Sequence, residues 1–259
     1  MKMNPMRVKL EKNEPIIGTF LDFGNADNAE ILAISPMDYI IIDAEHGPYG
    51  PETVADMVRA VELHDCTPIV RVQDHVRSSV LKMLDIGARG LIIPMIFNAD
   101  EVREIVRWGK YYPIGERGCG MGRQCDFGQA DCCKTGNIQD YFDAVNKETF
   151  IIPQCETVGA LENIEEIVNV PGVDGIFIGP FDLSISMGIP GQFSKPQFQA
   201  ALDKVLSACK AAGKFCMILS TDPLQDHANL KKGFIPCIHT DVNIYFRGLK
   251  ETCDKVLNG

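Results

Sequence analysis

Eight short apolar runs recur along the 259-residue chain, and each is nearly continuous instead of alternating with polar residues. Such runs are typical of strands that are buried on both faces, as in a parallel sheet. Amphipathic stretches with helical spacing separate them, and several of these end at glycine, a frequent helix stop. The apolar runs occupy residues 16–21, 38–43, 67–72, 89–94, 150–155, 174–179, 214–219 and 234–239.

Eight strands that alternate with helices over about 250 residues match the dimensions of a (β/α)8 TIM barrel. We therefore predict one barrel domain over residues 1–259, with an additional C-terminal helix over 241–259. A doubly wound open sheet is the alternative, but no G-x-G-x-x-G sequence follows the first strand. The expected helices cover 26–35, 51–65, 77–87, 99–112, 157–170, 197–213 and 223–233.

One connection is unusually long and is rich in glycine, cysteine and charge. It runs from about residue 112 to 139. Loops of this length in a compact domain are usually functional or mobile. We therefore expect an active-site loop there.

Composition excludes several classes of protein. Hydrophobic residues make up 46% of the chain and charged residues 23%, so it is not a disordered chain, a collagen or a coiled coil. No apolar run approaches the ~20 residues of a membrane helix, and the charged first fifteen residues are not a secretory signal. A net charge of −10 disfavours nucleic acid and anionic membranes as partners. We expect a cytoplasmic protein that acts on a small molecule.

Ten cysteines raise two further alternatives, a disulfide framework and a structural zinc site. The length of the chain argues against disulfides. Four cysteines cluster in the long connection, but they form no C-x-x-C pair, so zinc is the weaker interpretation. Five others lie in or beside apolar segments and are expected in the core as free thiols: Cys66, Cys155, Cys209, Cys216 and Cys237.

Polar residues stand at the carboxyl ends of most predicted strands, where a parallel barrel forms its active site. Any one of them has a structural explanation, because an Asp or Glu there often caps a helix or favours its first turn. Together they converge on one rim. They are Asp43, Glu45, His46, Arg71, Gln154, Glu156, Gly179, Pro180, Asp182, Ser220, Thr221, Asp222, His239 and Asp241.

Glu156 and Asp182 follow neighbouring strands and can share one hard cation, with positions left for water and substrate. Oxygen ligands favour Mg²⁺ or Mn²⁺ over zinc. Gly179 and Pro180 allow close backbone approach, and N–H groups that begin a helix there can bind a carboxylate.

Several motifs resemble those of the HpcH/HpaI aldolase family, the metal-dependent (class II) pyruvate aldolases that cleave 4-hydroxy-2-oxo acids. The likeness runs from about Ile17 to the end of the chain. It rests on D-x-E-H at 43–46, Arg71, the LDIGARGLIIPM run around Asp85, the ERGCG loop, Q-x-E-T at 154–157 and VDGIFIGPFDLSISMG around Asp182.

This resemblance implies a fold, an assembly and a reaction. The family fold is a (β/α)8 barrel of the phosphoenolpyruvate/pyruvate type. Its members usually form hexamers in which neighbouring barrels exchange the last helix. The implied cofactor is Mg²⁺ or Mn²⁺, with Co²⁺ as a further candidate, and the implied lyase reaction belongs to aromatic or sugar acid catabolism.

The resemblance also implies roles for individual residues. Glu156 and Asp182 would bind the metal. Arg71 would hold the keto oxygen of pyruvate, and Gln154 would line the site. The backbone at Gly179, Pro180, Phe181 and Asp182 would take the substrate carboxylate. His46 would be the acid/base residue, paired with Asp85, and Asp43 would support metal-bound waters or Arg71.

Departures from the family pattern bear on the aldehyde that is released. A CIHTD sequence, with His239, replaces a glycine-rich stretch at the end of the last strand, and Phe181 stands where a smaller residue is common. Two alternatives stay open. One is an acyl-CoA lyase of the malyl- or citramalyl-CoA type, in which Arg117 and Arg123 would bind the phosphates of CoA. The other is a non-catalytic zinc-binding protein.

A lysine Schiff base is a different way to stabilise the carbanion of an aldolase reaction. No lysine stands at the carboxyl end of a predicted strand. Lys214 begins the seventh strand and should therefore lie at the opposite end of the barrel.

Overall fold

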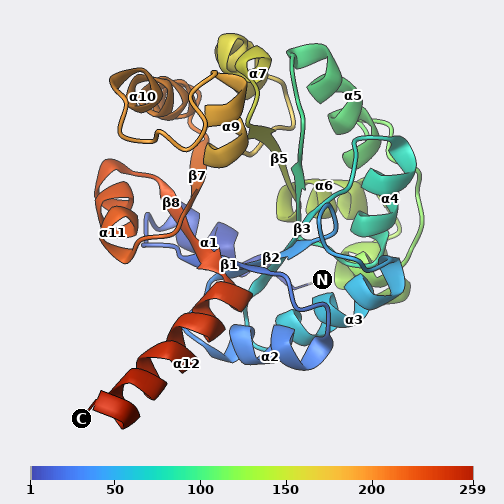
Figure 1. The fold of residues 1–259 in the computed structure, drawn as a ribbon. Coiled ribbons are helices and arrows are strands. Elements are labelled where there is room, and N and C mark those ends of the chain that lie inside the picture. Colours follow the sequence, from blue (N-terminus) through green and yellow to red (C-terminus); the bar gives the residue numbers. More distant parts are fainter. Residues whose placement is uncertain (1, 259) are drawn as a thin grey trace.

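The structure is a computed structural model that describes residues 2–258, and in these residues eight parallel strands close into a barrel in chain order. Figure 1 shows the strands in the centre, surrounded by a ring of helices. The strands are β1 (Gly18–Leu21), β2 (Tyr39–Asp43), β3 (Thr67–Arg71), β4 (Gly90–Ile93), β5 (Phe150–Cys155), β6 (Gly175–Ile178), β7 (Phe215–Ser220) and β8 (Ile235–Thr240). The predicted (β/α)8 barrel is confirmed, and each strand lies within one residue of its predicted range.

Eight helices occupy the seven predicted stretches, because one stretch is divided at Asn163 into two short helices. They are α2 (Ala26–Ile34), α3 (Pro51–Glu62), α4 (Arg77–Asp85), α5 (Ala99–Gly109), α7 (Val158–Glu162), α8 (Ile164–Val168), α10 (Pro196–Ala211) and α11 (Pro223–Lys232). The predicted last helix is α12 (Asp241–Asn258), which extends away from the ring in Figure 1.

The apolar residues form an inner and an outer layer because successive residues of a strand face opposite sides of the sheet. On β2, the side chain of Ile41 belongs to the core inside the barrel, whereas Ile40 and Ile42 pack against the helices outside. All five cysteines that were expected in the core are buried, at 0 or 1% exposure.

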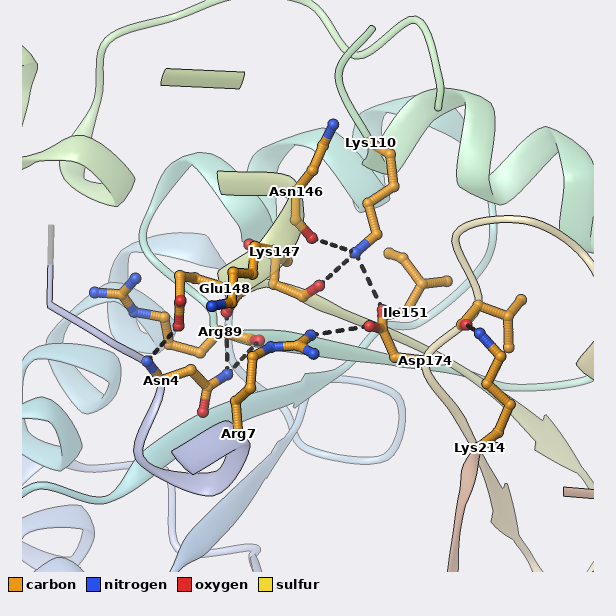
Figure 2. A network of polar contacts seen from close by, with 12 residues as sticks. Asn4, Arg7, Arg89, Lys110, Asn146, Lys147, Glu148, Ile151, Asp174 and Lys214 are labelled. Carbon is orange, nitrogen blue, oxygen red and sulfur yellow. Dashed lines mark hydrogen bonds and ion pairs between the residues drawn. The ribbon is translucent and has the colours of Figure 1, made fainter. Parts of the chain in front are cut away.

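Two further helices were not expected from the sequence, α1 (Pro5–Glu11) and α6 (Ile138–Glu148), whereas α9 (Pro180–Ser186) begins where a helix start was predicted. The first closes the end of the barrel where the strands begin, because the Met6 side chain is fully buried in the inner core. Figure 2 shows how this end is tied together. Asn4 contacts Glu148 and Arg89, and Arg7 and the buried Lys110 both contact Asp174.

Lys214 lies at this same end, and its Nζ donates to the carbonyl of Val173 at 2.6 Å, as Figure 2 shows. Val173 precedes β6 in the chain, so the lysine is at the amino ends of the strands. This placement confirms the prediction made for Lys214.

The long connection also lies at this end, so the prediction that it borders the cleft of its own chain is wrong. Arg117 pairs with Asp85 at 2.7 Å, and Arg123 pairs with Glu62. Asp85 and Glu62 are the last residues of α4 and α3, and these helices run antiparallel to the strands. The loop follows α5, which also ends at the amino ends of the strands. The length of the loop did not indicate at which end of the barrel it lies. It contains two 3-10 turns, η1 (Arg123–Gly128) and η2 (Asp131–Cys133).

Within residues 2–258, no helix combines the length and the apolar character that a membrane crossing requires.

Candidate active site

A cleft of about 370 Å³ opens at the carboxyl ends of the strands, and it gathers residues from seven of them. Eight predicted site residues line it: Asp43, His46, Arg71, Gln154, Gly179, Pro180, Phe181 and Asp182. Glu156 lies directly behind this lining, since a Cβ atom added at Gly179 would come within 2.9 Å of its Oε2.

Arg71 is held in place before any substrate arrives. Its Nε and Nη2 bind the two carboxylate oxygens of Asp43 at 2.8 and 2.6 Å, and its Nη1 lies 3.2 Å from Glu45. The guanidinium also lies 4.8 Å from the centre of the Phe20 ring. Burial alone would lower the pKa of Arg71, but the Asp43 carboxylate outweighs it and the pKa is raised. Arg71 is therefore a fixed cation facing the cleft, and of the two roles predicted for Asp43 the geometry supports the positioning of Arg71.

Glu156 is a buried carboxylate with a defined orientation. Its Oε1 accepts a hydrogen bond from the N–H of Met95 at 2.6 Å, and its Oε2 accepts one from the amide of Gln154. Burial raises the pKa of Glu156, the two hydrogen bonds oppose this, and the neighbouring charges of Glu45 and Asp182 raise it further. A buried carboxylate with a raised pKa beside other carboxylates is typical of a site that gains from a bound cation.

The same corner has room for a ligand. Gly179 has no side chain, and a Cβ atom there would also come within 2.9 Å of the Gln154 amide nitrogen. The Oε1 of Gln154 is buried and has no hydrogen-bond partner within the described residues. An open cradle beside an unpartnered buried oxygen and two carboxylates fits a hard cation with its water or substrate ligands.

The structure describes no cluster of three or more His, Cys, Asp or Glu side chains arranged as metal ligands in residues 2–258. The carboxylates predicted as metal ligands are the two of Glu156 and Asp182. The donors are oxygen atoms, which suit Mg²⁺ or Mn²⁺.

Asp182 and His46 are exposed members of the site, as is Phe181. Asp182 is in the first turn of α9, which begins with Pro180, so the peptide N–H groups of Phe181 and Asp182 are also in that turn. His46 follows β2 at the rim of the cleft, and its backbone N–H lies 3.4 Å from Asp43.

The predicted pair of His46 and Asp85 is wrong within one chain. His46 lies after a strand and Asp85 ends α4, so they are at opposite ends of the barrel. Asp85 instead accepts a hydrogen bond from Arg117 at 2.7 Å.

Two residues of the site were not assigned a role from the sequence. Glu45 contacts Arg71. The pKa of the Glu45 carboxyl is raised, and burial is the largest cause. Asp22, which follows β1, lines the cleft beside Thr240. Its position directly after a strand was the available signal.

The predicted rim residues beyond β6 do not all join the cleft. Asp222 caps α11 through the N–H of Leu224 at 3.0 Å, and Asp241 binds the N–H of Asp22 at 2.8 Å. His239 has a left-handed backbone, with φ of 56°, and lines a separate cavity beside α11.

The family model described as HpcH/HpaI aldolase/citrate lyase matches residues 17–235 of the chain. A 2-keto-3-deoxy-L-rhamnonate aldolase of Klebsiella pneumoniae is 36% identical over 220 residues, which cover 85% of this chain and 80% of the relative.

Solved structures give the same result. An HpcH/HpaI aldolase from Desulfitobacterium hafniense has a TM-score of 0.89 and 31% identity, and the match covers 98% of this chain and 97% of that one. A family protein from Burkholderia cenocepacia follows at 0.86 and 30%, with 98 and 99% covered. The chain therefore belongs to the HpcH/HpaI aldolase/citrate lyase family and is a carbon–carbon lyase of the aldolase type.

Proposed function

We propose that the protein cleaves a 4-hydroxy-2-oxo acid into pyruvate and an aldehyde, with a divalent cation held by Glu156 and Asp182. The cation would be Mg²⁺ or Mn²⁺, with Co²⁺ as a substitute. The observation that carries this proposal is the pairing of a fixed Arg71 with two carboxylates across one cleft.

Cleavage of the C3–C4 bond leaves an electron pair that the 2-oxo group accepts as an enolate. When bound, the cation supplies Lewis-acid polarisation of the 2-oxo group. Arg71 donates hydrogen bonds to the same oxygen and stabilises its developing charge, with no reorganisation because Asp43 already orients it. The first-turn N–H groups of Phe181 and Asp182 bind the substrate carboxylate.

The 4-hydroxyl group must lose its proton as the aldehyde forms. His46 stands at the rim of the same cleft, and imidazole is the side chain most often used as a general base. It takes this proton as general base. Protonation of the enolate at C3 then gives pyruvate.

The test is a coupled assay of pyruvate release from several 4-hydroxy-2-oxo acids, with metal and after chelation. We expect release that chelation abolishes and Mn²⁺ restores. An independent measurement is exchange of the C3 protons of pyruvate with D₂O, which follows enolate formation without an aldehyde. Absence of both activities in metal-loaded protein would refute the proposal.

The acyl-CoA alternative gains no support from the long loop, because Arg117 and Arg123 are engaged by Asp85 and Glu62. Membership of an aldolase family argues against the alternative of a non-catalytic zinc-binding protein.

We also propose a homo-oligomer, a hexamer by the family resemblance, in which α12 packs on a neighbouring barrel. This helix carries large apolar side chains in solvent: Tyr245, Phe246, Val256 and Leu257 are 62–80% exposed. Exposure of this kind on one projecting helix indicates an interface.

Native mass spectrometry tests this assembly. We expect about six times the 28.6 kDa chain mass, and smaller species when the chain ends after Asp241. A monomeric full-length protein at micromolar concentration would contradict the proposal.

A further inference from the structure

The order of strands around the barrel divides the cleft into two sides. The groups assigned to the pyruvate half lie in or directly after β3, β5 and β6: Arg71, Gln154, Glu156 and Asp182. Beyond β6 around the barrel come β7, β8 and β1, which contribute Leu219, Thr240 and Asp22 to the lining, and β2, with Asp43 and His46, then leads back to β3. The aldehyde half of the substrate must therefore face this second side.

Asp22 is the charged group on that side. Its neighbour Asp241 is already saturated, because its carboxylate accepts from the N–H groups of Asp22, Phe23 and Val242 and from the Asn28 amide. The Thr240 side chain lies beside the Asp22 carboxylate in the lining of the cleft. A carboxylate has about four acceptor positions, so Asp22 keeps the capacity to accept hydrogen bonds from a ligand in the cleft.

Phe181 closes the cleft on its other flank. A second cavity of about 310 Å³ lies beside the first, and Pro180, Phe181 and Leu219 line both. The Phe181 ring stands edge-on to Phe193, with ring centres 5.1 Å apart, and Phe193 in turn packs on Phe198 at 5.4 Å. This row of rings fills the boundary, so a chain of carbons that extends from the first cavity meets the Phe181 ring.

We propose that Asp22 binds a hydroxyl group of the aldehyde half and that Phe181 limits its length. The substrates are then 4-hydroxy-2-oxo acids that release a short hydroxyaldehyde. This inference rests on the proposed function and adds its substrate class.

The test compares aldehydes of matched length in the synthetic direction, with pyruvate and Mn²⁺-loaded protein. Glycolaldehyde is paired with acetaldehyde, and lactaldehyde with propionaldehyde. We expect kcat/KM to favour the hydroxylated member of each pair by about tenfold or more, since a site built to bind a hydroxyl discriminates against its absence. In Asp22→Ala this ratio should fall to about one.

Asp27→Ala is the matched control, because it removes an exposed carboxylate of α2 that lies outside the cleft. It should keep the wild-type ratio. Asp22→Asn, which preserves the shape, serves if the alanine variant fails to fold. A wild-type ratio near one, or a ratio that both Asp22 variants keep, would overturn the role of Asp22.

Length is tested with hexanal against propionaldehyde. Phe181→Ala joins the two cavities, so the relative kcat/KM for hexanal should rise by about tenfold or more. Ile185→Ala shortens another exposed side chain of α9 that lines neither cavity, and should keep the wild-type ratio. An unchanged ratio in Phe181→Ala would overturn the role of Phe181.

The outcomes separate this inference from the proposed function. Wild-type protein that neither exchanges the C3 protons of pyruvate nor releases pyruvate refutes both. Wild-type protein that does so, with selectivities unaffected by the substitutions, refutes the inference alone.

Discussion

At the scale of single residues, the site depends on groups whose charges are expensive to bury and are therefore held by specific partners. Arg71 keeps its charge because Asp43 binds it through two hydrogen bonds. Glu156 has no cation among its hydrogen-bond partners within residues 2–258, and burial raises its pKa. A bound divalent cation would remove this imbalance.

Replacement of Glu156 by Gln should weaken Mn²⁺ binding by about 100-fold and reduce metal-dependent pyruvate release by about 1,000-fold. The amide keeps the size of the side chain but not its charge. Titration of Mn²⁺ by calorimetry and the pyruvate assay measure the two effects. Glu165→Gln, a change at an exposed glutamate of α8, is the control, and near-normal metal binding in Glu156→Gln would contradict the metal assignment.

The buried carboxyl group of Asp226 lies outside the cleft, and it should make the free energy of unfolding depend on pH. Its side chain is 7% exposed, its Oδ1 has no hydrogen-bond partner within residues 2–258, and burial raises its pKa from 3.8 to about 6. Because the pKa of Asp226 is higher in the folded than in the unfolded protein, the folded state is stabilised when this carboxyl is protonated. The stabilisation is complete below about pH 4 and is lost as the pH rises through 6.

Asp226→Asn should therefore match the wild-type Tm near pH 4 and exceed it by a few degrees at pH 7. Thermal unfolding followed by circular dichroism over this range measures the difference. Asp203→Asn, at an exposed carboxylate, should show no such trend. A difference that is constant with pH would contradict the assignment.

At the scale of elements, each end of the barrel has its own task. The carboxyl ends of the strands present the polar site, while α1 closes the amino ends with Met6 in the inner core. The polar network in Figure 2 holds this closure in place through Asn4, Arg7 and Lys110. The residues that close and stabilise the barrel and the residues of the active site therefore lie at opposite ends of it.

Met6→Ala should lower the free energy of unfolding by about 2–4 kcal/mol, because it leaves a cavity in a packed core. The KM for substrate should not change, since the cleft is at the other end. Denaturant unfolding and steady-state kinetics test both expectations. Met3→Ala, at a side chain that is 70% exposed, is the control for the substitution itself.

At the scale of the whole molecule, binding of metal to the cleft couples to global stability. A ligand at 100 times its Kd stabilises the folded state by about 2.7 kcal/mol, which corresponds to a few degrees in Tm for a chain of this size. We expect Mn²⁺ to raise the Tm of the wild-type protein by this amount. In Glu156→Gln the shift should disappear, and an equal shift in both proteins would place the metal elsewhere.

The sequence alone determined the barrel, because a strand buried on both faces must be apolar at every position and eight such runs are visible without any partner. It also determined which residues end the strands, and parallel strands bring their carboxyl ends to one rim. Arg71, His46, Gln154, Glu156 and Asp182 could therefore be assigned to one site from the sequence.

Only the tertiary structure decided the placement of Asp85, of the long loop and of α1. Asp85 ends α4, and only the folded structure shows that its side chain meets Arg117 of the long loop. Short polar segments such as α1 gain their structure from the surface on which they pack. The pairing of Asp43 with Arg71 and the position of Asp22 likewise depend on side-chain contacts between strands, which are set by the closure of the barrel.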